Sequence, residues 1–224
     1  MHHRKLLSVL GKILETPTAP FHEYRMRDTI ASLLEPLPHV HLDYDDYGNL
    51  LVRYQRGRKR ARVAFGAHMD HPGWVIPPRS EDPDQAPKFL GGVPEKWLAS
   101  KHPVEWFGSF GMWDLPAFEL KDGKIISRAC DDLIGCSVMV SLLLELERLE
   151  VEATCHFIFT RAEEVGFVGA THLAKNWPYP DDVVFVSLET SAPAGVAEQG
   201  KGPTVRVGDR MSVFDPELTE ALLH

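Results

Sequence analysis

Hydrophobic and polar positions follow two periods along the chain, one typical of helices and the other of strands. Apolar residues three and four positions apart predict helices, and apolar residues in short runs or at every second position predict strands. The expected helices cover residues 6–14, 26–34, 133–149 and 169–175, and the expected strands cover residues 40–44, 50–54, 62–67, 155–160 and 183–188. This alternation predicts an α/β fold, with a mixed, mostly parallel sheet and helices on both faces.

One stretch in the middle of the chain departs from this pattern. Residues 77–116 are dense in proline, glycine and aromatic side chains and show no helical period, and a turn at Lys121–Lys124 follows them. We therefore predict an inserted β-rich subdomain over residues 75–127. The main α/β domain then consists of residues 1–74 and 128–224.

Composition adds an acidic charge balance to this picture. The chain has 224 residues, 24 Lys+Arg and 32 Asp+Glu, and a formal net charge of −8. Phosphates are bound mainly through Lys and Arg, so this excess argues against a nucleic-acid or anionic-membrane partner. The basic cluster at residues 53–62 is interpreted as an exposed, solubilising turn. Without an apolar run long enough for a membrane span, and with three cysteines in no C-x-x-C pair, we expect a cytoplasmic protein.

Histidine or acidic side chains stand at one end of four apolar segments. These residues are His68 and Asp70, Asp131 and Asp132, Glu163 and Glu164, and Glu189. In an open α/β sheet, ligands bind beyond the carboxyl ends of the strands. Carboxylates that converge there repel one another unless a cation lies among them, and divalent metals accept both His nitrogen and carboxylate oxygen. Each acid alone is better explained as a helix cap or a solvated surface residue, but together they favour a metal-assisted hydrolase.

The order of these motifs resembles the M42 family of co-catalytic metallo-aminopeptidases, the glutamyl aminopeptidase and tetrahedral-aminopeptidase group. The resemblance is carried by Asp46–Leu50, Ala67–Gly73, Leu90–Val93 and, most specifically, Glu163–Ala170. It implies a zinc-peptidase-like hydrolase that removes N-terminal residues from peptides. It also implies two divalent metal ions, zinc or cobalt with manganese also compatible, and a homo-oligomer.

The resemblance also gives each residue of the four segments a role. The metal ligands would be His68, Asp131, Glu164 and Glu189, and the catalytic residues would be Glu163 as general base and Asp70, which would orient His68. Asp131 would bridge the two metals, with Asp132 behind it. Glu189 stands where the family usually has an aspartate, so its extra methylene changes the reach of that ligand.

The family's last ligand is a histidine well downstream of Asp209-Arg210, and the printed sequence has no such segment. His224 comes too early in the pattern to replace it, so we expect either part of a longer peptidase or a degenerate relative. Two alternatives to a peptidase therefore stay open. One is a non-catalytic subunit that binds partners through the aromatic insertion, and the other is a metal-dependent amidohydrolase or deacylase. The other histidines are expected to be structural or at the surface, although His71 could line the site; they are His22, His39, His41, His102, His156 and His172.

Overall fold

The computed structural model describes residues 3–77, 86–100, 102–192, 197–210 and 212–224. The chain divides into two compact units, Met1–Thr190 and Ser191–His224, and each is described by itself. The larger unit contains the three sheets of the described residues and the residues of the predicted site. Among the described residues, no helix combines the length and the hydrophobicity that crossing a membrane requires.

A five-stranded mixed sheet forms the centre of the larger unit. Its strand order is β1-β2-β10-β3-β11, formed by Val40–Tyr44, Leu50–Gln55, Thr154–Thr160, Val63–His68 and Val184–Ser187. β10 pairs in parallel with β3, and β11 pairs in parallel with the other edge of β3. β10 is antiparallel to β2, and β2 to β1. The predicted fold class is therefore confirmed, and the parallel pairing is confined to three strands.

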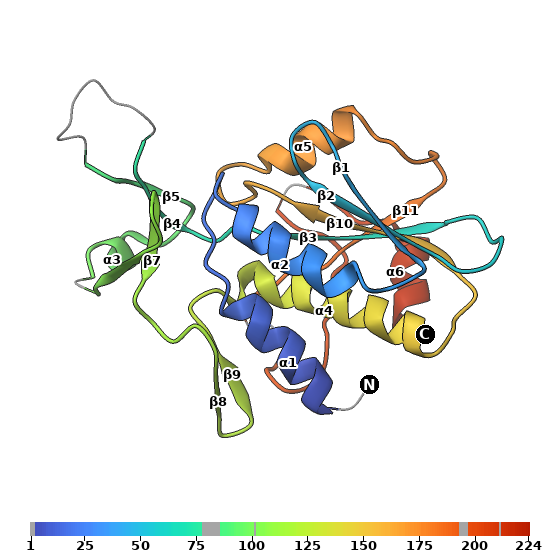
Figure 1. Cartoon of the computed structure of the whole chain (residues 1–224), viewed down its shortest axis with the longest axis horizontal. Coiled ribbons are helices and arrows are strands. Elements are labelled where there is room, and N and C mark those ends of the chain that lie inside the picture. The colour runs from blue at the N-terminus through green and yellow to red at the C-terminus, as the bar shows by residue number, and fades with distance from the viewer. Residues whose placement is uncertain (1–2, 78–85, 101, 193–196, 211) are drawn as a thin grey trace. The chain divides into compact units, whose positions relative to one another are not determined.

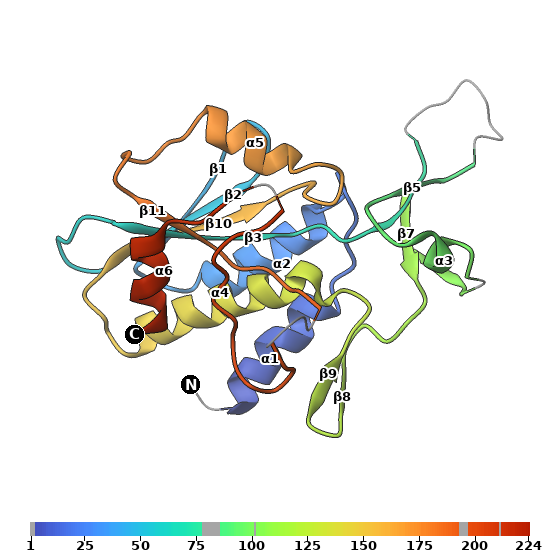
Figure 2. The same ribbon diagram turned by 180° about the vertical axis from the view of Figure 1, so that it is seen from behind.

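Helices cover both faces of this sheet, as the sequence pattern predicts (Figures 1 and 2). One face is covered by α1 (His3–Leu14), α2 (Tyr24–Leu34) and α4 (Cys130–Arg148), and the other by α5 (Val168–Lys175). Successive residues of β10 supply both cores, because side chains alternate between the faces of a strand. Phe157 and Phe159 join the cluster of α1, α2 and α4, while Ile158 packs with Leu173 of α5.

A second, antiparallel sheet follows β3. Its order is β5-β4-β7-β6, formed by Lys88–Leu90, Gly73–Val75, Phe110–Trp113 and Val104–Trp106, with the short helix α3 at Glu95–Leu98. Trp74, Phe89 and Trp113 pack ring against ring, with centroids 4.9–5.4 Å apart. The hairpin of β8 (Glu119–Lys121) and β9 (Lys124–Ile126) contains the predicted turn. These strands fit a β-rich insertion, but its bounds at residues 75–127 stay a prediction.

The smaller unit contains the helix α6, Pro216–Leu223. Asp215 precedes it as a capping residue and accepts a hydrogen bond from the backbone N–H of Leu218 at 2.8 Å. A side-chain acceptor at this position satisfies one of the backbone donors that every helix N-terminus leaves unpaired.

Candidate metal centre

The fold brings the four predicted segments together at one edge of the main sheet. β3, β10 and β11 run in parallel, so the residues that follow them emerge at the same edge. Thr160, the last residue of β10, lies opposite His68, the last residue of β3. Glu163 and Glu164 follow β10 in the loop to α5, and Glu189 follows β11.

His68 is the centre around which the acids gather. The imidazole side chain is only 4% exposed, and its Nε2 lies 3.2 Å from Asp131 Oδ1, 3.8 Å from Glu163 Oε2 and 3.9 Å from Glu189 Oε1. Two groups of potential ligand atoms share this histidine, each with all its atoms within 4.8 Å of one another: one adds Asp131 and Glu189, and the other adds Glu163 and Glu164.

The electrostatics of the cluster reflect an excess of negative charge. Burial alone would lower the pKa of His68, but the carboxylates of Asp131 and Asp70 outweigh it and raise that pKa to about 11. Burial and neighbouring acids raise the pKa of Glu164 to about 7. Partial burial and the hydrogen bond with Asp131 raise the pKa of Glu189 to about 7. Carboxylic acids that share a site do not all ionise readily, because their negative charges repel one another. A bound cation offsets this repulsion.

Asp70 connects His68 to the two glutamates. Its carboxylate is fully buried and accepts hydrogen bonds from the backbone N–H groups of Glu163 at 2.9 Å and Glu164 at 3.1 Å. His68 Nδ1 lies 3.1 Å from the backbone oxygen of Asp70 and 3.5 Å from its carboxylate. The residue therefore contacts the histidine mainly through its main chain and supports the loop of the glutamates through its side chain.

Asp131 and Asp132 face different partners because neither has helical backbone angles at the start of α4. Asp131 contacts His68, whereas Asp132 is fully buried and its Oδ1 accepts hydrogen bonds from Gly135 N–H at 3.2 Å and Thr190 Oγ1 at 3.3 Å. The bond to Gly135 is the helix-capping role that an acid at this position can have. Among the residues that the structure describes, none donates a hydrogen bond to the other carboxylate oxygen, Oδ2.

The donor set fits a divalent cation. One imidazole nitrogen and several carboxylate oxygens converge within hydrogen-bonding or near-contact distances, and no described residue donates to the buried Asp132 Oδ2 behind them. This mixture of nitrogen and oxygen ligands suits zinc, cobalt and manganese alike. All the predicted ligand residues lie in or beside the cluster.

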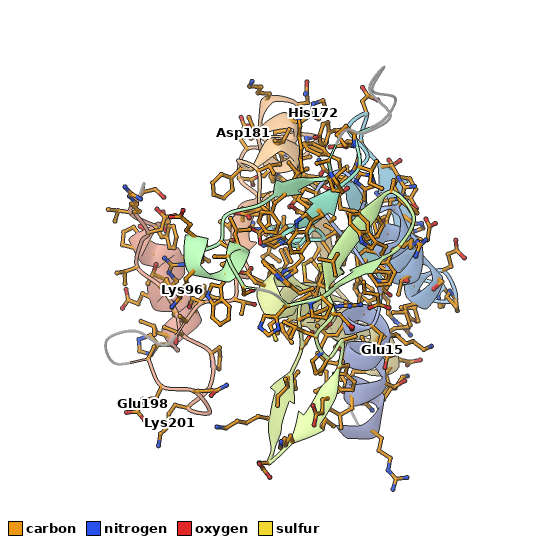
Figure 3. All side chains as sticks on the ribbon, turned by 90° about the vertical axis from the view of Figure 1, so that its left-hand side faces the viewer. Glu15, Lys96, His172, Asp181, Glu198 and Lys201 are labelled. Carbon is orange, nitrogen blue, oxygen red and sulfur yellow. The ribbon has the colours of Figure 1, made fainter. Side chains whose placement is uncertain are left out.

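The other histidines are placed in different surroundings. His71 Nδ1 lies 2.9 Å from the backbone oxygen of Asp131, and burial lowers the pKa of this ring. His39 pairs with Glu147 at 2.9 Å. His172, on α5 and labelled in Figure 3, stacks on Tyr47 with ring centroids 5.5 Å apart. Of these, His71 alone is in contact with a residue of the cluster.

Four residues of the site region were not predicted. Thr190 donates to Asp132, and its hydroxyl also lies 3.2 Å from the backbone oxygen of Cys130. Glu23, Asn49 and Arg161 hold the loop that follows β10. Glu23 is distant in sequence from the motifs, and a single buried acid has no periodic signature. Asn49 lies within the Asp46–Leu50 motif, which is the sequence signal that could have indicated it.

Comparison with known proteins identifies the family. The family model described as M42 glutamyl aminopeptidase matches residues 95–224, more than half of the chain. A relative from Acetivibrio thermocellus, provisionally named an aminopeptidase, is 32% identical over 108 residues, which are 46% of this chain. The chain spans only 32% of the length of that relative. FrvX of Escherichia coli (strain K12), also provisionally named an aminopeptidase, is 22% identical over 96% of this chain and 75% of its own length.

Solved structures show the same fold. The TET1 peptidase of Pyrococcus horikoshii, described as able to assemble into a tetrahedron or a large octahedral shell, aligns with a TM-score of 0.77. That alignment covers 97% of this chain and 80% of the other at 22% identity. The likeness in fold agrees with the family match, and the expected family is confirmed. The chain therefore belongs to the M42 glutamyl aminopeptidase family of metallopeptidases.

Proposed function

We propose that this chain forms the metal-binding part of an aminopeptidase that hydrolyses N-terminal residues from peptides. The observation that carries the proposal is the convergence of Asp131, Glu163 and Glu189 on His68 Nε2 at 3.2–3.9 Å. His68, Asp131, Glu164 and Glu189 would hold two divalent cations, zinc or cobalt with manganese compatible, and Asp131 would bridge them. The cations, when bound, supply Lewis-acid activation of water and of the substrate carbonyl.

Glu163 is the proposed general base. Burial raises the pKa of this carboxyl, which makes it a better proton acceptor than an exposed glutamate. A carboxylate oxygen of Glu163 accepts a proton from the attacking water as the new C–O bond forms. The same oxygen then passes the proton to the amine nitrogen as the peptide C–N bond breaks. Asp70 keeps Glu163 in place by accepting a hydrogen bond from the backbone N–H of Glu163.

A homo-oligomer is the assembly we propose, with copies meeting through the second sheet. Trp97 of α3 and Trp106 of β6 are 50% and 44% exposed. The related TET1 peptidase is described as forming a tetrahedral or octahedral shell. The mass of the particle in solution, measured by light scattering, tests this assembly. The cytoplasmic location expected from the sequence stays a prediction.

The test of the activity combines metal analysis with a substrate panel. Wild-type protein, Glu163→Gln and the exposed control Glu35→Gln are loaded with zinc or cobalt, and the metal content per chain is measured. Each is then assayed on aminoacyl p-nitroanilides and on the same compounds with an acetylated amine. Glu163→Gln is expected to keep its metal and to lose about 10²–10⁴-fold in kcat, and the control is expected to match wild type.

The outcomes separate the three candidate functions. Hydrolysis of free-amine substrates alone supports the aminopeptidase, whereas hydrolysis of the acetylated compounds supports an amidohydrolase or deacylase. A wild-type protein that binds no stoichiometric metal supports the non-catalytic subunit. If Glu163→Gln hydrolyses the substrates as fast as wild type, Glu163 is not the general base.

A further inference from the structure

The loop between β10 and α5 presents Glu163 and Glu164 to the site, yet its backbone is irregular. Ala162 and Phe167 both have positive φ angles, 53° and 57°, in a region that side chains other than glycine rarely adopt. A loop with such angles keeps one conformation only if its surroundings hold it.

Four consecutive backbone N–H groups of this loop all donate to buried side chains. The last two, of Glu163 and Glu164, donate to the carboxylate of Asp70. The first two donate to different parts of the chain: Arg161 N–H to Asn49 Oδ1 at 3.0 Å, and Ala162 N–H to Glu23 Oε1 at 3.0 Å. We call Glu23, Asn49 and Asp70 together the loop cradle.

Glu23 is directed at the loop instead of at its own helix. It is the N-cap residue of α2, but its side chain makes no capping hydrogen bond. One carboxylate oxygen accepts from Ala162 and Phe21 N–H groups, and the other accepts from Arg161 Nε at 2.8 Å. The side chain is fully buried, and a buried carboxylate is costly unless it is paired and hydrogen-bonded in this way.

Asn49 connects both ends of the loop. Besides accepting from Arg161 N–H, its amide donates to the backbone oxygen of Gly169 at 3.0 Å and to Asp45 Oδ2 at 2.6 Å. A Cβ atom on Gly169 would lie 2.5 Å from Asn49 Oδ1 and 2.4 Å from the backbone oxygen of Arg161. The start of α5 is therefore packed directly against the start of the loop, with Asn49 between them.

We propose that Glu23 and Asn49 are positioning residues for the site, which act by holding the loop so that Glu163 and Glu164 face His68. The inference rests on the proposed function, because it assigns these residues to a site whose activity is itself proposed. Both residues bind the loop directly, Glu23 through Ala162 N–H and the Arg161 side chain and Asn49 through Arg161 N–H and the Gly169 backbone oxygen. Residues that orient metal ligands through hydrogen bonds have such effects. Replacing one of them typically lowers metal affinity or activity by about 10–100-fold.

A purely structural role makes a different prediction. If Glu23 and Asn49 only stabilise the fold, their replacement lowers the melting temperature, while kcat and metal affinity per folded molecule stay unchanged. A positioning role changes those two quantities as well. A displacement of a catalytic group by about 1 Å is enough to cost about 10²-fold in rate.

The experiment compares Glu23→Gln, Glu23→Ala and Asn49→Ala with the exposed control Glu35→Gln, all in the full chain. Zinc affinity is measured by competition with a chelator, and kcat and KM are measured on an aminoacyl p-nitroanilide. Glu23→Gln keeps an acceptor for Ala162 N–H but loses the pairing with Arg161, so its effect is expected to be smaller than that of Glu23→Ala. We expect about 10–100-fold losses in kcat or zinc affinity, with KM nearly unchanged.

Hydrogen exchange on the wild-type protein provides a readout that needs no variant. The N–H groups of residues 161–164 are expected to exchange slowly in the metal-free protein, because the loop cradle holds them. Rapid exchange of these amides, or variants that match Glu35→Gln in both kcat and zinc affinity, overturns the inference. If wild type binds zinc but hydrolyses nothing, the proposed function fails, and the zinc affinities of the variants still decide the positioning role.

Discussion

Replacement of Asp70 by asparagine tests how far one buried carboxylate supports the site. The wild-type side chain accepts N–H bonds from Glu163 and Glu164 at 2.9 and 3.1 Å, one with each oxygen. Asparagine keeps one oxygen and places an amide NH₂ group opposite the other N–H. One hydrogen bond is therefore lost, and one backbone donor faces another donor.

The magnitude follows from these two contacts. An N–H group left without an acceptor costs about 1–3 kcal/mol. The hydrogen bond that remains changes from charge-assisted to neutral and has about half its former strength, which adds about 1 kcal/mol. The sum is about 2–4 kcal/mol in the free energy of unfolding, which a domain with an ordinary stability of about 5–15 kcal/mol survives. Loss of the carboxylate beside His68 should also weaken metal binding by about 10–100-fold.

Urea denaturation of the metal-free protein measures the first effect, and chelator competition measures the second. The matched control is Asp181→Asn, which changes an exposed aspartate labelled in Figure 3. Surface substitutions usually stay within about 0.5 kcal/mol of wild type. If Asp70→Asn behaves like this control in both measurements, the role assigned to the Asp70 carboxylate is refuted.

Two further predictions concern pH and glycine. Because the pKa values of Glu164 and Glu189 are raised from 4.5 to about 7, the folded chain holds protons that the unfolded chain has released. The metal-free protein should therefore lose stability as pH rises from about 4.5 through about 7, and the raised pKa of His68 extends this trend upward. Thermal melting between pH 5 and 8.5 measures it, and a melting temperature that rises with pH contradicts it. Gly135→Ala should destabilise the chain by about 1–3 kcal/mol, because a Cβ there would lie 2.5 Å from Asp132 Oδ1. Unchanged urea stability of this variant would contradict that contact.

The sequence was sufficient to predict the helices and strands that form and cover the main sheet, for physical reasons, whereas the roles of the site residues stay predictions. Periodicity indicated the helices and strands because each buries one face, and the parallel strands then brought their carboxyl ends together. The loop cradle could not be predicted in the same way. Glu23 and Ala162 are 139 positions apart, and their hydrogen bond exists only after the tertiary structure has formed. Likewise, Asp131 and Asp132 are adjacent in sequence but differ in environment because the backbone at the start of α4 is not helical.

The position of β10 in the main sheet has a consequence for folding. β10 lies between β2 and β3, although it follows both of them by about ninety residues in the sequence. During synthesis, β2 and β3 therefore lack the strand that pairs with both of them until residue 160 has been added. Until then, the position between them in the sheet is not filled. Long-range pairing of this kind slows folding and exposes strand edges meanwhile. A nascent chain that stops before β10 should consequently engage chaperones, and release from them should coincide with the synthesis of that strand.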